Sequence, residues 1–569
     1  MTFTQGNSFT AKLLFIPFFI LLFFSHSFAQ RGIQTDVPAI KDVFKNDFYF
    51  GCLLSYPHVG FASDPHVPGQ SNIVDQNGGY LIKYHMNSMS PGNNMKPQNI
   101  VDIGASATRY NNASAAEKEF YDVNPVIRFN GNMIAQLNWA QRQGFTFRGH
   151  TLVWHNQTPG TAFFRTGYSA NGARLSKEKM TLRMENFIKE TIRIIHEGWP
   201  GLLTAMDVVN EAVNDNGTDR ISNNEWYETF GDISYIMKAF EFARKYTIEY
   251  GETQMKLYYN DYNTHQSAKA DGIVRVCKPI YEAGYLDGIG MQDHDQYNSP
   301  TAAQWIASYN KFAEICDEIS VTELDVKPST SANSLITQAN QYGQLFKCFL
   351  DRSYFSGRGK LISVSKDGLN DNWAFVKSAS LWDENNQCKP AFYEVVKVGL
   401  FYNSLDSLIT FAETLIESDY TPDSWNEFTT SLTGAKESMM NNYSYLVSTG
   451  DALENAFNNL DSSIKQLDDN TTSVDNFDNK LPDDFSLMQN YPNPFNPTTT
   501  IVFSLPHSTQ VKLVVFDVMG KTIAELVNGN YNAGRHKVNF NANGISSGIY
   551  FYRLEAGNFS ANKKLLLLK

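Results

Sequence analysis

Residues 207–212 read DVVNEA, a β-branched apolar run that ends in Asn210 and the carboxylate of Glu211. Residues 318–326 read EISVTELDV and have the same form, with Glu323 near the carboxyl end. In a barrel of parallel strands, the residues that follow the strands share one rim and face one cleft. Two carboxylates across a cleft are the minimum that hydrolysis of a glycosidic bond requires. The two stretches therefore predict a parallel barrel with a candidate site on its rim.

Apolar runs alternate with helical patterns over residues 46–398. Apolar spacing marks 177–197 as an amphipathic helix whose stripe includes Leu182, and 233–250, 302–316 and 331–351 are further helix candidates. Gly and Asn cluster at 64–80 and predict a loop insertion. Eight strands with intervening helices are typical of a (β/α)8 barrel, an α/β fold. The predicted strands are 48–54, 84–89, 146–153, 205–209, 255–259, 288–291, 318–322 and 361–364.

The length and charge of the chain limit the possible functions. Its 569 residues exceed one ordinary domain and predict three or more units. Apolar content of 42% suits a large core, and aromatic content of 14% leaves aromatic side chains for a ligand surface. The formal net charge of -12 argues against nucleic acid as a partner, because phosphate binding needs clustered Lys and Arg. That charge suits a neutral polysaccharide.

Residues 1–29 have the pattern of a secretory signal peptide, with a positive charge at Lys12, an apolar stretch at 13–24 and a small-x-small cleavage site at 27–29. The alternative is a membrane anchor, but the apolar run of about 12 residues is shorter than the ~20 that a spanning helix needs. The five cysteines are scattered and include no CxxC pair. We therefore expect mostly buried thiols rather than a disulfide framework.

The last third of the chain changes character twice. Residues 401–467 carry three apolar stripes at helical spacing and predict a three-helix module. It resembles the short helical modules beside surface glycosidase domains, and both a sugar-binding module and a plain spacer stay open. Residues 468–484 are polar and acidic, as expected of a linker. Alternating runs over 485–569, with turn signals at Met519-Gly520, Asn528-Gly529 and Gly544, predict a small β-sandwich.

The paired carboxylates suggest two different tasks. Glu211 is the candidate general acid/base, which must protonate the leaving oxygen and later deprotonate water. Glu323 is the candidate nucleophile and must stay ionised. Two carboxyl groups ~5 Å apart would predict a retaining mechanism through a covalent glycosyl-enzyme. For one Glu after a strand, a helix cap or a surface charge is the alternative, and it weakens when two such residues share the same setting.

Over residues 46–398 the chain resembles glycoside hydrolase family 10, the endo-1,4-β-xylanase family. Five motifs carry this resemblance, in the family's order and at comparable spacing, whereas any one alone would be a weak signal. They are 148–157 (RGHTLVWHNQ), 207–211 (DVVNE), 260–263 (NDYN), 288–294 (GIGMQDH) and 322–325 (TELD). The resemblance implies a (β/α)8 glycosidase domain, placed at residues 30–400, and a retaining endo-β-1,4-xylanase that needs no cofactor.

The resemblance also implies catalytic roles. Glu211 matches the acid/base and Glu323 matches the nucleophile. Asn210 matches the amide that holds the sugar 2-hydroxyl beside the nucleophile, a contact expected to strengthen in the transition state. His294 matches the histidine that hydrogen-bonds the nucleophile, with Asp325 behind it. Such a pair would orient the carboxylate and help to keep it charged.

Further matches line the cleft. Gln292 matches a polar partner near the acid/base, and Tyr262 matches an aromatic on the leaving-group side. A lone His or Trp is more often a packing residue, so the remaining assignments depend on the motifs around them. They are His150, Trp154 and Gln157 on the non-reducing side, with Asn93 and Lys96 as sugar-contacting positions in the stretch 87–97, NSMSPGNNMKP.

The sequence departs from the family pattern at two positions. The family's Glu in the 87–97 stretch is Gly92 here, which removes an acceptor for sugar hydroxyls two units from the cut. At the last strand, Trp373 matches the second aromatic that covers the reacting sugar, but its partner eight positions earlier is Ser365. The chemistry should survive, because neither position carries a proton or acts as nucleophile. Xylan preference and binding strength should change, by about 1 kcal/mol or more for a lost aromatic platform.

Residues 488–569 resemble the type A carboxyl-terminal sorting domain of the type IX secretion system. The resemblance rests on 489–499 (QNYPNPFNPTT), 515–520 (VFDVMG) and 544–550 (GISSGIY). It implies passage across an inner membrane by the signal peptide, then export across an outer membrane with the secretion machinery as partner. A plain sandwich or a carbohydrate-binding module is the alternative, since β-sandwiches host many functions.

Three other functions stay open. A retaining hydrolase of another β-1,4-glycan or of a decorated xylan is motivated by Gly92 and Ser365. A non-catalytic surface glycan-binding protein would be favoured by loss of a catalytic Glu, and neither Glu is lost. A metal-dependent hydrolase is weaker, because the run 293–295, Asp-His-Asp, matches no standard metal spacing and retaining glycoside chemistry needs no metal. We expect a monomer without metal or cofactor.

Overall fold

The computed structural model describes most of the chain outside its amino-terminal segment. The predicted signal peptide lies outside the described residues, as do residues 468–481 of the predicted linker, residues 64–75 of the predicted loop insertion and the predicted turn at 519–520. The described ranges are 32–54, 76–353, 357–374, 376–440, 445–467, 484–490, 497–517, 521–545 and 548–567, with the single residues 482, 493 and 495.

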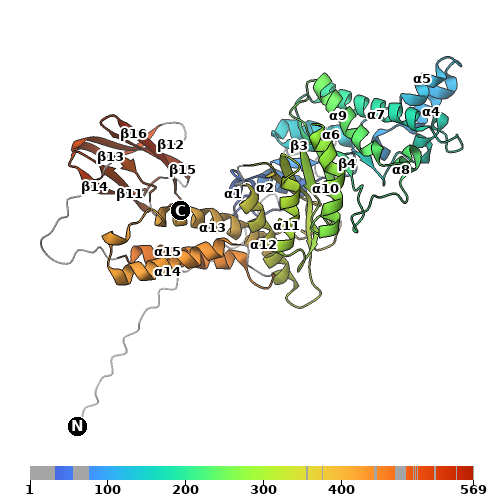
Figure 1. The fold of residues 1–569 in the computed structure, drawn as a ribbon. Coiled ribbons are helices and arrows are strands. Elements are labelled where there is room, and N and C mark those ends of the chain that lie inside the picture. Colours follow the sequence, from blue (N-terminus) through green and yellow to red (C-terminus); the bar gives the residue numbers. More distant parts are fainter. Residues whose placement is uncertain are drawn as a thin grey trace, which may run out of the picture.

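Eight parallel strands close into a barrel, which confirms the predicted α/β fold (Figure 1). The strand order is β6-β5-β4-β3-β2-β1-β9-β8, and pairing of β6 with β8 closes the ring. The short strand β7 extends the sheet beside the end of β8. The strands are β1 Tyr49–Leu53, β2 Ser88–Ser90, β3 Thr146–Trp154, β4 Leu203–Asn210, β5 Lys256–Asp261, β6 Gly288–Met291, β7 His294–Gln296, β8 Glu318–Lys327 and β9 Lys360–Lys366.

Helices surround the strands, as α9, α10 and α11 show in Figure 1. Most of the longer helices connect one parallel strand to the next. The helices of this part are α1 Ile40–Val43, α2 Gln76–His85, α3 Pro97–Ile100, α4 Ile103–Asn112, α5 Lys118–Val123, α6 Gly131–Gln143, α7 Lys177–Gly198, α8 Glu225–Phe230, α9 Ser234–Glu249, α10 Ser267–Glu282, α11 Ala302–Ala313 and α12 Ser334–Ser353, with 3-10 turns at Thr161–Phe164 and Thr166–Tyr168.

The second predicted strand, at 84–89, was placed wrongly. Residues 76–85 form α2, so the strand begins only at Ser88, and the loop predicted up to residue 80 ends earlier. Leu81, Ile82 and His85 are all fully buried, and their spacing puts them on one face of a helix. A short apolar run fits either a strand or a buried helix, and here the packing decided for the helix.

Helix α7 confirms the amphipathic helix predicted at 177–197. It begins after Ser176, whose side chain accepts a hydrogen bond from the backbone N–H of Lys179 and so caps the first turn. Its buried face includes Met184 and Ile192. Leu182 was wrongly assigned to the buried stripe, because its side chain is 49% exposed.

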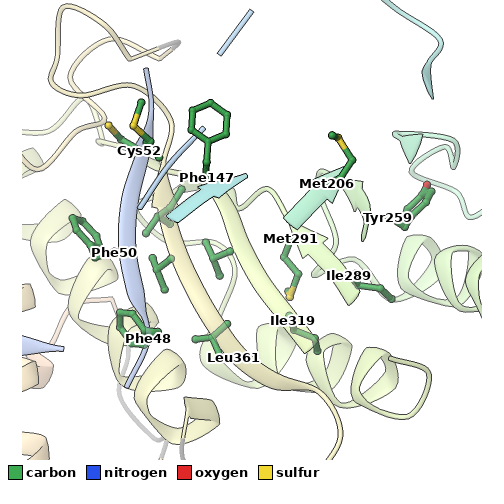
Figure 2. Close-up of a cluster of buried hydrophobic side chains, with 14 of the residues drawn as sticks. Phe48, Phe50, Cys52, Phe147, Met206, Tyr259, Ile289, Met291, Ile319 and Leu361 are labelled. Carbon is green, nitrogen blue, oxygen red and sulfur yellow. The ribbon is translucent and has the colours of Figure 1, made fainter. Parts of the chain in front are cut away.

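The barrel interior and the space between strands and helices form one continuous apolar core. Figure 2 shows part of it, where Phe50, Ile319 and Leu361 project from strands β1, β8 and β9. These three side chains are fully buried. Each barrel strand is covered by helices on one face and packs against the side chains of the barrel interior on the other. Because both faces are buried, the sequence of such a strand is a continuous apolar run. The core therefore holds the strand ends, and the residues that follow them, in fixed positions.

Three further helices follow the barrel, α13 Pro390–Ala412, α14 Pro422–Met439 and α15 Thr449–Lys465, with a 3-10 turn at Glu417–Asp419. They extend from the barrel toward the carboxyl-terminal sheets in Figure 1. Helix α13 runs through residue 400, where the sequence placed the end of the barrel domain. The same apolar core continues from the barrel into these helices, through residues such as Leu405 and Leu453.

The carboxyl-terminal strands form two antiparallel sheets around a core of their own, as predicted for a sandwich. The turn predicted at Asn528-Gly529 was wrong, because both residues lie inside β13, opposite Lys512 and Val511. An Asn-Gly pair favours a turn, but the ladder with β12 overrides that preference. The strands are β10 Ser486–Leu487, β11 Thr498–Leu505, β12 Thr509–Asp517, β13 Thr522–Tyr531, β14 Gly534–Asn541, β15 Gly548–Ala556 and β16 Phe559–Leu567.

The cysteines are all free thiols, and each except the half-buried Cys388 is buried, which confirms the expectation from their spacing. Burial raises the pKa of Cys388 to about 12, so its thiol stays protonated at neutral pH. Within the described part of the chain, no helix combines the length and the apolar character needed to cross a membrane.

Candidate active site

Left-handed backbone conformations cluster at the carboxyl ends of four neighbouring strands. Glu211 follows β4 with a φ of 55°, and Gln157, Asn263 and Asp293, after β3, β5 and β6, have φ of 42°, 51° and 56°. Such a conformation costs a residue with a side chain on the order of 1–3 kcal/mol and persists where the surroundings hold it in place, often at functional sites. These four residues therefore mark the rim that the sequence predicted as the site.

Three side chains donate hydrogen bonds to the carboxylate of Glu211. Trp154 Nε1 lies 3.0 Å from Oε2, whereas Asn210 Nδ2 and Gln292 Nε2 each lie 3.2 Å from Oε1. The donors come from the ends of β3 and β4 and from the residue after β6. All three are neutral, so they orient the carboxyl group of Glu211 without adding a positive charge beside it.

Glu323 lies within β8, where the pairing of β8 with β9 shifts its register, and 13% of its side chain is exposed. Asn260 Nδ2 donates to its Oε1 at 3.0 Å, and His294 Nε2 lies 3.4 Å from its Oε2. On the other side of the imidazole ring, His294 Nδ1 lies 3.4 Å from Asp325 Oδ2. The structure thus places the three residues in a line, with the imidazole between two carboxylates.

The ionisation states of Glu323 and His294 support each other. Burial acts to raise the pKa of Glu323, but the hydrogen bond from His294 and the electrostatic influence of His150, His294 and Lys96 lower it to about 2. Burial also acts against a charged His294, yet the neighbouring carboxylates of Asp325 and Glu323 raise its pKa well above the usual value. Glu323 is therefore an anion at neutral pH, the form that a nucleophile needs.

Asn260 connects the two carboxylates, although the sequence pointed to it only as part of a motif. Its Nδ2 lies 3.0 Å from both Glu323 Oε1 and Asn210 Oδ1, and its Oδ1 accepts from Thr322 Oγ1 at 2.7 Å. Because Asn210 donates to Glu211, an unbroken chain of side chains joins both candidate catalytic groups. The available signal was its place directly after the predicted strand 255–259, where Glu211 and Glu323 also follow predicted strands.

A polar cluster lies on the β3 side of Glu211. Lys96 Nζ lies 4.7 Å from the centroid of the Trp154 ring, and Gln157 Nε2 donates to Asn93 Oδ1 at 3.4 Å. The charges of Glu323 and Glu211 both act on Lys96, so its amine lies near the two carboxylates as well as over the Trp154 ring. An aromatic face with hydrogen-bonding groups around it suits a sugar ring, because such a ring has apolar faces and hydroxyl-bearing edges.

His150 is buried beneath this cluster. Its Nδ1 lies 2.9 Å from Asp207 Oδ2, and Arg148 Nε donates to the same oxygen at 3.1 Å. The contact with Asp207 fixes the orientation of the imidazole ring. Nδ1 faces Asp207, and Nε2 lies on the opposite side of the ring. The ring centroid lies 6.4 Å from that of Trp154. His150 therefore joins the group of residues around Glu211 and Glu323 that the sequence singled out.

Tyr262 follows β5, and its hydroxyl accepts a hydrogen bond from Arg220 at 2.8 Å. Arg220 also donates through Nε to the backbone oxygen of Glu211 at 2.8 Å. The sequence did not single out Arg220, because it lies in the loop after β4, nine residues beyond Glu211. A lone arginine in a loop carries no signal that distinguishes such a contact from a solvent-exposed charge.

Gly92 is required by the backbone at its position. Its φ is 55°, and a Cβ added there would lie 2.6 Å from the backbone oxygen of Leu54. A residue with a side chain at this position would therefore need a strained backbone conformation, and Leu54, the residue after β1, would have to shift. The local path of the backbone therefore excludes the family's Glu at position 92. The difference from the family involves the backbone as well as the side chain.

Ser365 and Trp373 differ in their exposure to solvent and in the structural element to which they belong. Ser365 lies within β9, opposite Gly51, and is buried. Trp373 is 37% exposed, in a segment where its backbone N–H donates to Asn370 O. Two buried charged residues come next, Lys366 as the last residue of β9 and Asp367 directly after it. Charged groups therefore lie at the end of β9, where the resemblance implied an aromatic wall, and Asp367 lies close to His294.

Among the described residues, His294, Asp325 and Asp367 form a group that could hold a metal ion, since one ligand atom from each lies within 4.8 Å of the others. The charges of Asp325 and Asp367 both act on the fully buried Lys366. Burial lowers the pKa of Lys366 to about 8, which still leaves the amine mostly protonated at neutral pH. A cation from the chain itself therefore already balances these two carboxylates.

Comparisons with known proteins agree with this geometry. The family model for glycosyl hydrolase family 10 matches residues 39–398, and that for the secretion system C-terminal sorting domain matches residues 489–568. The bifunctional endo-1,4-beta-xylanase XylA of Ruminococcus flavefaciens is 33% identical over 356 residues, which cover 62% of this chain and 34% of the relative. Endo-1,4-beta-xylanase Y of Acetivibrio thermocellus is 33% identical, over 63% of this chain and 32% of that protein. The chain thus spans about a third of the length of these two relatives.

Solved structures show the same barrel. Endo-1,4-beta-D-xylanase 10B of Clostridium thermocellum, complexed with xylohexaose, superposes with a TM-score of 0.54 and 30% identity, over 63% of this chain and 67% of the other. The intracellular xylanase TsXylA of Thermoanaerobacterium saccharolyticum, complexed with xylotriose, gives a TM-score of 0.52 and 27% identity, over 64% of this chain and 99% of the other. The sorting-domain match also confirms the tail expected from the sequence and marks the chain for export by type IX secretion.

Proposed function

The chain belongs to glycosyl hydrolase family 10, and we propose that it is a retaining endo-β-1,4-xylanase that acts outside the cell. The observation that carries the proposal is the contrast between two linked carboxylates. His294 holds the pKa of Glu323 at about 2, as a nucleophile requires. The Glu211 carboxyl group instead accepts hydrogen bonds from three neutral side chains, which orient it for exchange of a proton with the leaving oxygen.

The two carboxylates then act in sequence. A Glu323 oxygen attacks the anomeric carbon. The bond from that carbon to the glycosidic oxygen breaks, and Glu211 transfers its proton to the glycosidic oxygen of the leaving sugar. The product is an ester of Glu323 with the sugar, while Asn210 holds the neighbouring hydroxyl. Glu211 next takes a proton from water, and the resulting attack releases Glu323. Two displacements at one carbon retain its configuration, and both carboxylates return to their starting states.

A second candidate is a retaining hydrolase of another β-1,4-glycan or of a decorated xylan. It is favoured by the chain path at Gly92, which leaves no room for a side chain, and by the charged residues Lys366 and Asp367 at the end of β9. A subsite bounded by charge favours sugars with additional hydroxyl groups, since buried polar groups need partners. Catalytic residues and mechanism are the same for both candidates.

Product analysis tests these candidates. The mature chain, residues 30–569, is incubated with linear xylan, arabinoxylan, mixed-linkage glucan and cellulose, with the Glu323→Ala variant as control. We expect short xylo-oligosaccharides from the unsubstituted enzyme only. Cleavage of a different glycan alone would favour the second candidate. Binding without cleavage by a well-folded protein would reject both, in favour of a non-catalytic glycan-binding protein.

Replacing His294 by alanine should move the acidic limb of the pH profile of kcat/KM to higher pH, by about one to three units. In the native site the Glu323 anion persists down to a pKa of about 2, because His294 outweighs the effect of burial. Without His294, the burial of Glu323 still raises the pKa of its carboxyl group. The Glu323 anion is then protonated at a higher pH, and activity is lost sooner as pH falls. The profile is measured on a soluble xylo-oligosaccharide across the acidic range.

Two variants make this experiment specific. His294→Gln keeps a hydrogen-bond donor without the charge and should shift the limb by less than His294→Ala. His196→Gln changes a histidine on α7 that lies 2.9 Å from Glu252 and serves as the matched control. An acidic limb that stays in place in His294→Ala would mean that His294 does not maintain the charge of Glu323.

For the carboxyl-terminal sandwich, we propose that it engages the secretion machinery and takes no part in catalysis. Its core is separate from that of the barrel, which holds all the candidate site residues. Deleting residues 485–569 should stop export in a host with type IX secretion while leaving kcat/KM of the purified enzyme within about twofold. Cell fractionation measures the first effect, and the inactive Glu323→Gln chain with an intact tail should still be exported.

A further inference from the structure

Arg220 contacts both the backbone of Glu211 and the side chain of Tyr262. Its Nε donates to Glu211 O at 2.8 Å, and one terminal nitrogen donates to the Tyr262 hydroxyl at 2.8 Å. Its own backbone N–H donates to Ala212 O at 2.9 Å, which folds the loop after β4 back on itself. One guanidinium therefore joins the candidate acid/base to the aromatic residue assigned to the leaving-group side.

The backbone of Glu211 needs such support. Its φ of 55° is one that residues with a side chain rarely adopt. The peptide groups on both sides of the residue are held, because its N–H donates to Asn260 O at 2.9 Å and its carbonyl accepts from Arg220. A residue fixed at both peptide groups has a fixed Cα–Cβ direction. The carboxyl group of Glu211 is thus aimed partly by a contact outside its own side chain.

Tyr262 is held from two directions as well. The Nζ of Lys269 lies 3.5 Å from the centroid of the ring, and this amine is fully buried, with Asp261 Oδ1 at 2.8 Å. Arg220 binds the hydroxyl at the ring edge. A charged guanidinium that donates several hydrogen bonds in a fixed plane transmits a displacement of one partner to the other. A sugar that packs against Tyr262 therefore acts on the same network as the Glu211 backbone.

We propose that Arg220 is a positioning residue that couples occupancy of the leaving-group side at Tyr262 to the aim of the Glu211 carboxyl group. Proton transfer to the leaving oxygen then depends on the leaving sugar being seated against Tyr262. This inference rests on the proposed function, in which Glu211 is the acid. It adds a residue that touches no reacting atom and acts through two residues that do.

Leaving groups of different acidity test the proposal. For Arg220→Ala, kcat/KM on xylohexaose should fall on the order of 10²-fold, because an unactivated sugar cannot leave without a proton. On 2,4-dinitrophenyl β-xylobioside, whose phenol departs without a proton, kcat/KM should fall by less than about threefold. Both values report steps up to formation of the glycosyl-enzyme, so the ratio of the two losses isolates proton donation. An equal loss on both substrates would show a merely structural role and overturn the proposal.

A double-mutant cycle tests the route through Tyr262. Tyr262→Phe removes the hydroxyl that Arg220 binds and should lower kcat/KM on xylohexaose by a factor of about 5 to 10. Combined with Arg220→Ala, it should add almost no further loss, because the same link is already broken. Fully multiplicative losses would mean that Arg220 and Tyr262 act independently, which contradicts the coupling.

Matched variants keep the test interpretable. Arg275→Ala removes another arginine that binds the same loop, through Gly217 O at 3.2 Å and Asp219 Oδ1 at 2.6 Å, and it should leave the ratio of the two substrates unchanged. Should Arg220→Ala fail to fold, the same ratio of losses is measured for Arg220→Lys. A lysine keeps the positive charge, but its single amine cannot reproduce the two hydrogen bonds that the planar guanidinium donates to Glu211 O and to the Tyr262 hydroxyl. No cleavage of any glycan or aryl xylobioside by the unsubstituted enzyme would instead count against the proposed function itself.

Discussion

Replacing Glu323 by glutamine is expected to lower kcat/KM on xylan on the order of 10⁴-fold or more, since loss of a nucleophile removes the whole covalent route. Glutamine has nearly the same shape and can still bond to Asn260, so the fold should be retained. Its amide cannot displace a leaving sugar, and it cannot form the charge pair with His294. Steady-state rates with xylan, together with a melting curve for each protein, provide the measurement.

The control for this change is Glu318→Gln, the same substitution at the first residue of β8. Glu318 accepts a hydrogen bond from the Tyr258 hydroxyl at 2.9 Å and lies outside the site, so activity should change by less than about twofold. Glu323→Ala with added azide supplies a second readout. A single displacement by azide should give the α-glycosyl azide, and recovery of a β-product would exclude Glu323 as the nucleophile.

Replacing Glu211 by alanine should lower kcat/KM on xylan by about 10²- to 10⁴-fold, because the leaving oxygen no longer receives a proton. With 2,4-dinitrophenyl β-xylobioside the first step should remain fast. The glycosyl-enzyme should then accumulate, because no base activates water. A burst of dinitrophenol followed by slow turnover is the expected time course, and mass spectrometry should detect the sugar attached to Glu323.

Azide distinguishes Glu211 from Glu323. In Glu211→Ala, azide should restore turnover and give the β-glycosyl azide, because it attacks the intermediate after Glu323 has already inverted the carbon once. Glu228→Ala is the matched control, since this glutamate pairs with Arg174 at the protein surface and has no contact with the site. Equal losses on xylan and on the dinitrophenyl substrate, without a burst, would remove Glu211 from the role of acid/base.

The sequence located the two catalytic candidates and most of their neighbours because each follows a predicted strand or belongs to a motif. Where it failed, a local pattern fitted two structures. Residues 84–85 were read as strand but lie in α2, and Asn528-Gly529 was read as a turn but lies in β13. In both cases burial or a strand ladder outweighed local preference. The prediction that Leu182 is buried was wrong for a related reason, because an apolar residue next to the buried stripe of a helix need not face the core.

The site also contains residues that local patterns could not assign. Asn260 connects the carboxylates through partners 50 and 63 residues away, and Arg220 acts through contacts to Glu211 and Tyr262. Gly92 looked like a lost side chain, whereas the backbone oxygen of Leu54 leaves no space for one. Each of these facts depends on where another segment passes, which spacing along the chain does not determine.

The sequence by itself determined the barrel, the placement of Glu211 after β4 and of Glu323 on β8, and the sorting tail; β8 runs on to Lys327, past the strand end predicted at residue 322. Periodic burial and strand-end positions are local properties, so they can be read along the chain. The tertiary structure decided how the two carboxylates differ. Trp154 and Gln292 reach Glu211 across 57 and 81 residues, and His294 lies within 3.4 Å of Glu323 only because β7 extends beside β8. Hydrogen bonds and charges act over a few ångströms in space, so the charge of Glu323, on which the chemistry depends, is set by the fold.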